Sequence, residues 1–273
     1  ASNRVEVFAA SKYANLLSHY RDIDAQYPGG GLSQRYVQQE AYATAGAALH
    51  LDKWSFALAA DYALGTMRSN LKTDNDVLRH TLLQSTSVRF HTDRFALTAR
   101  AVASLIDNKV KDNAARAARR VSRLSPSVGA VWRVLGSETV RRGSAALRLR
   151  ADYRETFRAP TFTESYFYHL GSQSLRPETV RQGGGGFTLD ALSRSGRLSL
   201  QLTADAYANR TADRIVSIPI RLFCWKTVNL GTVLGLGLDA TLEASYRYTA
   251  RHLLSLAANY SLSHVTDRTD PAD

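Results

Sequence analysis

The sequence predicts an all-β protein built from long antiparallel strands, with the features of a transmembrane β-barrel. Three observations lead to this fold class. Apolar and polar residues alternate with a period of two in many segments, several of these segments are ten to fifteen residues long, and the connections between them alternate between short and long. Alternation of this kind places one set of side chains on each face of a strand.

The clearest alternation lies in residues 197–211. Leu198, Leu200 and Leu202 share one face of this segment, and the polar residues between them share the other. A helix would distribute the same apolar side chains around its axis, whereas a strand gathers them on one side. The same pattern predicts about eleven strands in all. The other ten are residues 5–17, 37–51, 54–64, 82–90, 95–105, 126–135, 145–154, 183–189, 234–248 and 254–262.

The predicted strands are long enough to cross a bilayer. Strands of soluble proteins usually have about five or six residues, and a tilted strand needs about nine to eleven to span a membrane. The apolar faces also end in aromatic residues, as they do at the two interfaces of a membrane barrel. These residues are Trp54, Trp132, Tyr153, Tyr246 and Tyr248.

The connections favour an outer-membrane barrel over a soluble all-β protein. Short connections are predicted at 51–53, 91–94, 136–143, 193–196 and 249–251, and long polar ones at 20–35, 67–79, 107–125, 154–181 and 210–229. An outer-membrane barrel has short turns on its periplasmic side and long loops outside. A soluble sandwich has no reason to alternate its loop lengths so regularly.

Composition sets further bounds. No stretch approaches eighteen consecutive apolar residues, which excludes a helical membrane protein. The net charge of +11 indicates an anionic partner without choosing among nucleic acid, lipid and an acidic ligand. The single cysteine, Cys224, has no metal-ligand spacing around it. The run of four glycines at 183–186 lacks the lysine and helix of a phosphate-binding loop, and in a strand it indicates a bend or a close approach of the chain.

The long connection 154–181 is the first candidate for ligand contact. Tyr166, Phe167, Tyr168 and His169 form a run of four rings that we expect to be exposed, which is costly without a partner. By contrast, we expect Phe157, Pro160 and Phe162 to fold the loop onto the barrel rim. In the next long connection, Arg221, Phe223 and Trp225 are further candidates for ligand contact, although Phe223 and Trp225 could instead be lipid-facing anchors.

The same connection carries a motif. "FRAPTFTESY" followed by "GSQSLRPE" resembles the barrel signature of TonB-dependent outer-membrane receptors, which reads approximately F-R-A-P-T, an acidic residue, an aromatic residue, then G-N-x-x-L-K-P-E. Ser172 and Arg176 replace the Asn and Lys of that pattern. The later segment "VNLGTVLGLGLD" resembles the hairpin that follows in the family. The matching residues include Phe157, Arg158, Pro160, Thr161, Glu164, Leu175, Pro177, Glu178, Asn229 and Gly237.

The resemblance implies that residues 1–273 are part of a receptor barrel, about half of a 22-stranded one, with the N-terminal plug domain absent. It is closest to the cobalamin-receptor branch in Bacteroidetes, through the segments "TADRIVSIP" and "FCWKTVNLGTV". The expected function is active import of a scarce nutrient, with cobalamin favoured and an iron siderophore or haem as the alternative. The implied location is the outer membrane of a Gram-negative bacterium.

The resemblance also implies partners. TonB, with ExbB and ExbD, would act through the plug, a surface lipoprotein would cap the loops, and lipid and lipopolysaccharide would surround the barrel. The basic stretch 107–123 is either a solvated loop or a contact for lipopolysaccharide phosphates or for an anionic group of the substrate. We expect no nucleic-acid partner, because basic residues gather in a loop while strand aromatics lie on the apolar face.

The sequence gives less support to three other function classes. An enzyme is not expected, because no catalytic arrangement of Ser, His, Asp or Cys, and no paired carboxylates, occur in a plausible context. We expect no cofactor and no metal site; calcium at Asp74, Asn75 and Asp76 has only weak support, since their spacing does not fit a calcium loop. A passive porin and a soluble basic β-protein stay as alternatives to the receptor.

Overall fold

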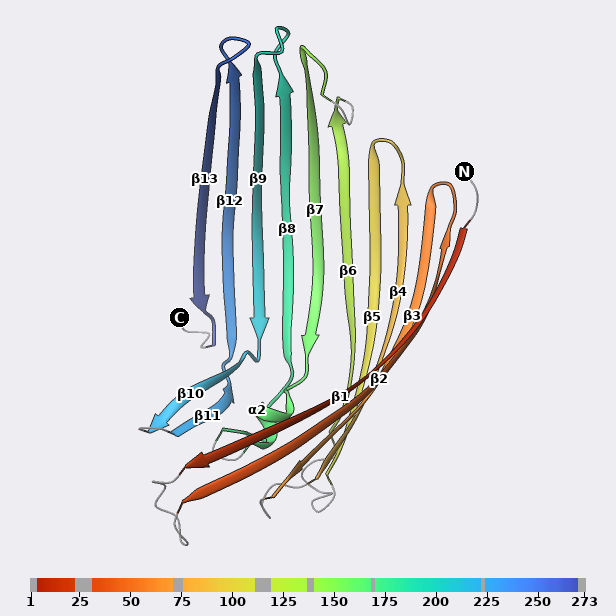
Figure 1. The fold of residues 1–273 in the computed structure, drawn as a ribbon, viewed down its shortest axis with the longest axis vertical. Coiled ribbons are helices and arrows are strands. Elements are labelled where there is room, and N and C mark those ends of the chain that lie inside the picture. The colour runs from red at the N-terminus through yellow and green to blue at the C-terminus, as the bar shows by residue number, and fades with distance from the viewer. Residues whose placement is uncertain are drawn as a thin grey trace.

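The computed structural model describes residues 4–22, 31–70, 76–110, 119–136, 140–167, 170–221 and 224–269. They form one curved antiparallel sheet of eleven strands, in the order β1 to β9, then β12 and β13 (Figure 1). Each strand pairs with its neighbour in the sequence, except that β9 pairs with β12 and the separate hairpin β10–β11 is inserted between them. This confirms the predicted antiparallel wall of about half a barrel.

The strands have the following bounds: β1 Arg4–Asp22, β2 Leu32–His50, β3 Trp54–Ser69, β4 Val77–His91, β5 Phe95–Val110, β6 Arg119–Leu135, β7 Ser144–Arg158, β8 Glu178–Leu192, β9 Leu198–Ala212, β10 Ile215–Arg221, β11 Cys224–Asn229, β12 Thr232–Arg247 and β13 Leu253–Asp267. The one helix of the described residues is α2 (Phe162–Tyr166), a single turn. None of the helical structure described is long and apolar enough to span a membrane.

All eleven predicted strands are confirmed, and most extend beyond the predicted bounds. For example, β1 has 19 residues, which corresponds to about 60 Å of extended chain. The hydrocarbon core of a bilayer is only about 30 Å thick. The extra length lies mainly toward the long connections, where neither face of a strand needs to be apolar and the alternation signal fades. The hairpin β10–β11 and the helix α2 were not predicted, since both lie in segments expected to be loops.

Two neighbouring rows of residues across the sheet show how its faces differ. One row is almost entirely apolar and the adjacent row, on the other face, is largely polar. The apolar row is Val5, Leu49, Phe56, Val88, Ala99, Val128, Tyr153, Gly183, Ala208, Leu236 and His264; the polar row is Glu6, Ala48, Ala57, Ser87, Arg100, Ser127, Arg154, Gln182, Asn209, Gly235 and Val265. An apolar outer and a polar inner face are the two sides of a membrane barrel wall.

Large aromatic side chains gather on the apolar face near the short turns. Trp54 pairs in register with Phe90, and their ring centroids are 4.7 Å apart. Phe95 pairs with Trp132 on the next strands, and both tryptophans are exposed. Tyr246 is also exposed near this end of β12. The predicted band of interface aromatics is therefore present over several strands of the sheet.

Of the four glycines in β8, Gly184 and Gly186 lie on the polar face, and Gly186 makes room there for charged side chains. Arg150 of β7 reaches over Gly186 to Asp205 of β9: its Nε lies 2.6 Å from Asp205 Oδ1, and a second contact joins Nη2 to Oδ2. Arg150 Nη1 also donates to Thr188 Oγ1 at 2.8 Å. A Cβ on Gly186 would lie 2.2 Å from Asp205 Oδ1 and 2.3 Å from the backbone oxygen of Ala204. The close approach expected for this glycine run is therefore found.

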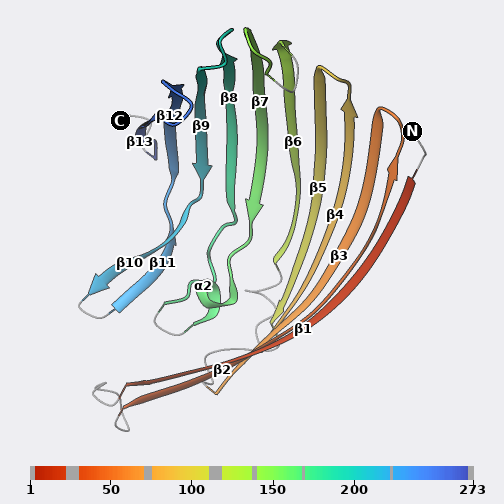
Figure 2. The ribbon, with the colours of Figure 1, turned by 45° about the horizontal axis from the view of Figure 1, so that its top comes forward.

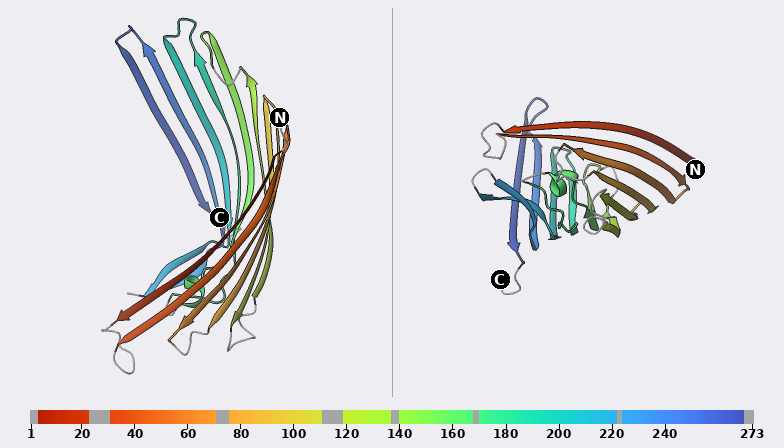
Figure 3. Two further views of the ribbon diagram at one scale, coloured as in Figure 1. Left: turned by 45° about the vertical axis from the view of Figure 1, so that its right-hand side comes forward. Right: turned by 90° about the horizontal axis from the view of Figure 1, so that it is seen from below.

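The connections sort to the two ends of the sheet as predicted. The short turns lie at one end, at the top of Figure 1, and the long connections lie at the other. At the long-connection end, β1 and β2 curl across the concave side of the sheet (Figure 2). The view from below shows α2 within this concave side (Figure 3). The connection between β7 and β8 thus folds inward and does not project away from the sheet.

We expect the variant Gly186→Ala to destabilise the barrel by about 1–3 kcal/mol, because its methyl group would collide with rigid backbone at Ala204 and displace the Arg150–Asp205 pair. The measurement is the urea midpoint of the intact protein folded in detergent. Gly183→Ala is the matched control, since a Cβ there meets its nearest atom at 3.8 Å. Equal midpoints for the two variants would contradict the packing role of Gly186.

Candidate functional site

The candidate site is the connection between β7 and β8, which we call the cap and define as residues 159–177. Its helix α2 begins at a capping box. Thr161 Oγ1 accepts a hydrogen bond from the Glu164 backbone N–H at 3.2 Å, and Glu164 Oε2 accepts one from the Thr161 backbone N–H at 2.8 Å. These bonds satisfy backbone donors that the first turn of a helix leaves open. The pattern Thr-x-x-Glu was a sequence signal for this helix that the prediction overlooked.

Ion pairs hold the two ends of the cap together. Arg158, the last residue of β7, pairs in register with Glu178, the first residue of β8. Its guanidinium donates to both Glu164 oxygens at 3.0 and 2.9 Å, and to Glu178 Oε2 at 3.2 Å. Glu178 Oε2 also accepts the backbone N–H of Ile215, the first residue of β10, at 3.1 Å. Arg158 therefore joins the cap to both flanking strands, and through Glu178 it is also linked to the neighbouring hairpin.

The electrostatic environment favours the ionised form of Glu164. Partial burial alone would raise the pKa of its carboxyl group, but the hydrogen bonds from Thr161 and the Arg158 guanidinium outweigh burial, and the pKa lies below its usual value of 4.5. Burial alone would lower the pKa of Arg158, but the carboxylates of Glu164 and Glu178 outweigh burial and raise it. Glu164 and Arg158 thus both carry their charges at neutral pH.

Aromatic residues of the cap pack on the inner face of the opposite strands. Tyr36, Met67, Val77, Val110 and Tyr166 form a buried cluster, with Phe162 and Phe167 packed against it. The rings of Phe167 and Tyr36 stack with centroids 4.0 Å apart and an interplanar angle of 10°. This contact ties the connection after β7 to β2, which lies far from it in the sequence. The cap therefore spans the concave side of the sheet.

The hairpin β10–β11 holds the cap from a second side. The Asn229 side-chain amide accepts the Arg176 backbone N–H at 2.7 Å and donates to the Arg176 backbone oxygen at 2.9 Å, as a neighbouring strand would. Its Nδ2 also lies 2.8 Å from the backbone oxygen of Asp213, a residue with a positive φ of 54°. Arg176 in turn pairs with the Asp213 carboxylate at 2.6 Å. The buried Thr227 donates its backbone N–H to Leu170 of the cap at 2.8 Å.

The residues of the family-like motif therefore converge on one structure. Arg158, Thr161, Glu164, Glu178 and Asn229 supply the hydrogen bonds that shape and anchor the cap, as described above. Leu175 of the cap is buried, and Pro160 and Pro177 line the cavity beside it. Phe157 is the penultimate residue of β7, at the base of the cap. Gly237 provides the space that the Tyr207 ring occupies on the inner face of β12. Sequence reasoning found these residues but could not show that they touch.

The predicted ligand-contact residues have different surroundings. Tyr166 was expected to be an exposed ring, and this is corrected: only 9% of it is exposed, because the cap folds inward onto β2–β5. Phe167 stacks on Tyr36 in the same packing. Trp225 is 50% exposed on β11. Tyr168, His169 and Phe223 lie outside the described residues, as does the side chain of Arg221, whose backbone ends β10. Their roles in ligand contact stay predictions.

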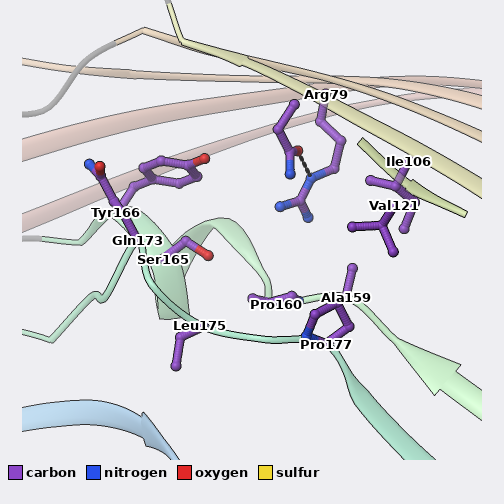
Figure 4. Close-up of a pocket in the computed structure, with 11 residues that line it drawn as sticks. Arg79, Ile106, Val121, Ala159, Pro160, Ser165, Tyr166, Gln173, Leu175 and Pro177 are labelled. Atoms are coloured by element: carbon purple, nitrogen blue, oxygen red, sulfur yellow. Dashed lines mark hydrogen bonds between the residues drawn. The ribbon is translucent and has the colours of Figure 1, made fainter. Parts of the chain in front are cut away.

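Two hollows on the inner side of the sheet differ in size, chemistry and position: the first adjoins the cap, and the second lies near the short turns, at the opposite end of the strands. A cavity of about 40 Å³ lies between the cap and β4–β6, lined by Arg79, Ser165 and Tyr166 among others (Figure 4). It has room for about three water-sized groups. A wider, open hollow of about 530 Å³ lies on the polar inner wall, lined by Arg148, Asp190, Gln201, Glu243 and neighbours.

Metal-ligating residues do not cluster in the part of the chain that the structure describes: no group of three or more His, Cys, Asp or Glu side chains is placed to hold an ion there. Of the calcium candidates, Asp74 and Asn75 lie outside the described residues, and Asp76 directly precedes β4.

A family model described as TonB dependent receptor-like, beta-barrel, matches residues 6–273, and the chain belongs to this family. Solved structures share the fold. The copper transporter OprC aligns with a TM-score of 0.64 at 14% identity, over 95% of this chain and 43% of OprC. The FrpB iron transporter from Neisseria meningitidis (F5-1 variant) aligns with a TM-score of 0.63 at 14% identity, over 96% and 42%.

A third similar structure is the RagAB peptide importer, with a TM-score of 0.51 at 15% identity, over 96% of this chain and 34% of that one. The chain thus spans less than half the length of each of these structures. At such identities the likeness establishes the fold alone. The comparison with curated protein sequences gives no match.

We expect the variant Glu164→Gln to loosen the cap at neutral pH, because it removes the charge that binds Arg158. Amide hydrogen exchange of residues 158–178 in the intact protein should become roughly two- to fivefold faster, since partial solvent exposure limits the strength of the pair. Glu155→Gln is the matched control, because it breaks the separate Arg181–Glu155 pair of the same two strands. Unchanged exchange in Glu164→Gln would contradict the anchoring role.

Cap stability should also depend on pH. Because the pKa of Glu164 is lowered in the folded protein, its contribution is fully present above the usual value of 4.5 and is lost as the pH falls through the lower folded pKa. Cap exchange, corrected for the intrinsic effect of pH on amides, should therefore rise below pH 4.5 in the unmodified protein. The rise should be much smaller in Glu164→Gln, and identical profiles would exclude Glu164 as the titrating group.

Proposed function

We propose that the intact protein is an outer-membrane receptor that binds a scarce nutrient at its extracellular end and imports it with energy supplied through TonB. The observation that carries the proposal is the cap: an aromatic segment on the long-loop side, folded into the concave side of a barrel wall and anchored by the Arg158 network. A segment packed across the interior narrows the passage through a barrel. A gated receptor needs such a segment, because it must close over its cargo.

The polar inner wall fits the same function. Arg148, Arg150 and Arg154 of β7 face inward, where they meet Asp190, Asp205 and Gln182. These groups are satisfied by neighbours on adjacent strands, so that the wall is a stable, hydrated surface along which a plug domain and a polar cargo can move. In this proposal, the protein makes and breaks no covalent bonds: it works by binding and by conformational gating.

Cobalamin is the favoured cargo, and its support is the resemblance of the "TADRIVSIP" and "FCWKTVNLGTV" segments, which form the hairpin β10–β11 and its flanks. The alternative is an iron siderophore or haem; structures with this fold include transporters described as carrying copper, iron and peptides. The partners in this proposal are TonB with ExbB and ExbD acting through a plug, a surface lipoprotein over the loops, and lipopolysaccharide around the barrel.

The test of cargo class is equilibrium binding to the intact receptor in detergent, with cyanocobalamin and haemin measured side by side. Saturable binding of cyanocobalamin without haemin would support the favoured cargo. Haemin binding without cyanocobalamin would support the alternative. Binding of neither would reject both cargo assignments while the receptor class is tested separately, by whether uptake of a nutrient by cells requires TonB.

Trp225 is the described candidate contact best placed to meet cargo, since its ring is half exposed on the hairpin that also anchors the cap. We expect Trp225→Ala to weaken cargo binding at least about fivefold, which is the loss of roughly 1 kcal/mol of ring contact. The urea midpoint should stay unchanged, because an exposed ring stabilises the fold little. Ile220→Ala, at an exposed apolar residue of the paired strand β10, is the control. Equal affinities for both variants would remove Trp225 from the site.

A further inference from the structure

Among the described residues, Arg79 of β4 has no salt-bridge partner. Its Nε donates to Asn108 Oδ1 at 2.6 Å, and its guanidinium carbon lies 4.6 Å from the centre of the Phe162 ring. Within the described residues, its two Nη atoms have no hydrogen bond, and no carboxylate lies within 4.0 Å of them. A half-buried guanidinium that leaves four N–H donors unused is costly unless an acceptor is supplied.

The nearest carboxylate does not meet this need. Glu164 is close enough to act electrostatically on Arg79. Its oxygens, however, are bound by Arg158 and Thr161, as the hydrogen bonds of the cap show. Arg79 therefore faces the cavity between the cap and the barrel wall with its charge only partly balanced.

Two largely buried residues direct hydroxyl groups toward the same cavity. Ser165 and Tyr166 are only 8% and 9% exposed, and in the described part of the chain neither hydroxyl has a hydrogen-bond partner. Figure 4 shows both hydroxyls pointing toward the space beside the Arg79 guanidinium. Burial raises the pKa of the Tyr166 hydroxyl, and the charge of Arg79 offsets this only in part, so the group stays protonated and can donate.

We propose that the cavity beside Arg79 is a binding site for a small monovalent anion, either chloride or a carboxylate group, held by the Arg79 guanidinium and the hydroxyls of Ser165 and Tyr166. The volume of about 40 Å³ fits a group of this size. The anion would link β4 to α2 by charge-assisted hydrogen bonds, and so would hold the cap closed against the inner wall. The site goes beyond the proposed transport function and does not depend on the identity of the cargo.

The test uses the intact receptor in detergent, with sodium chloride and sodium acetate titrated separately. A bulky sulfonate buffer anion, too large for the cavity, keeps the ionic strength constant. The readout is amide exchange of residues 158–178. An anion that binds should slow exchange with a saturable dependence on its concentration. At ten times the concentration that half-fills the site, exchange should be roughly tenfold slower. Saturation with chloride identifies a free-ion site, and saturation with acetate alone identifies a carboxylate site.

Variants separate this site from general effects of salt. Arg79→Met should abolish the anion dependence, and Tyr166→Phe and Ser165→Ala, which keep the packing of α2, should each shift the midpoint several-fold upward. Arg181→Met, which removes a cation paired outside the cavity, should leave the dependence unchanged. The proposal is overturned if neither anion slows exchange, which would mean that water alone fills the cavity. An unchanged anion dependence in Arg79→Met would overturn it as well.

Discussion

The structure depends on one constraint: each strand between β1 and β13 in the sheet pairs its backbone with two neighbours while it presents an apolar face to one side and a polar face to the other. Antiparallel pairing in sequence order meets this demand with short turns at one end, and it leaves the register no freedom, since a slip of one residue would exchange the faces. The row from Val5 to His264 and the polar row beside it show that the register holds across all eleven strands. Where the inner face must carry long charged side chains, glycine makes the space, as Gly186 does for Arg150.

Under the cap, at the long-connection end, the inner face of the sheet is apolar and not polar. Here Met67, Val77 and Val110 point inward and are buried, because the aromatic residues of α2 cover them. The cap would not stay in this position through apolar contact alone, since it contains a single helical turn. Arg158 and Asn229 fix its two sides through the side-chain hydrogen bonds that join β7, β8 and the hairpin β10–β11.

This arrangement bears on gating. The anchoring bonds of the cap are polar and partly exposed, while its contact with the inner wall is an aromatic cluster beside an incompletely balanced cation. Salt, pH and a bound group therefore affect the polar anchoring bonds and the aromatic contact differently. In the proposed receptor function, release of the cap from the wall, with its two ends still attached to the strands, would be the movement that admits cargo.

The sequence by itself determined the fold class, the eleven strands, the order of short and long connections and the residues of the motif, because these follow from local alternation and from recognisable spacing. It did not determine the full strand lengths, since beyond the membrane-facing part neither face needs to be apolar. It also did not show that Tyr166 and Phe167 pack inward, or that Asn229 binds Arg176 across 53 positions of sequence. Only the tertiary structure decided these contacts, because they join segments whose proximity is created by the curvature of the sheet.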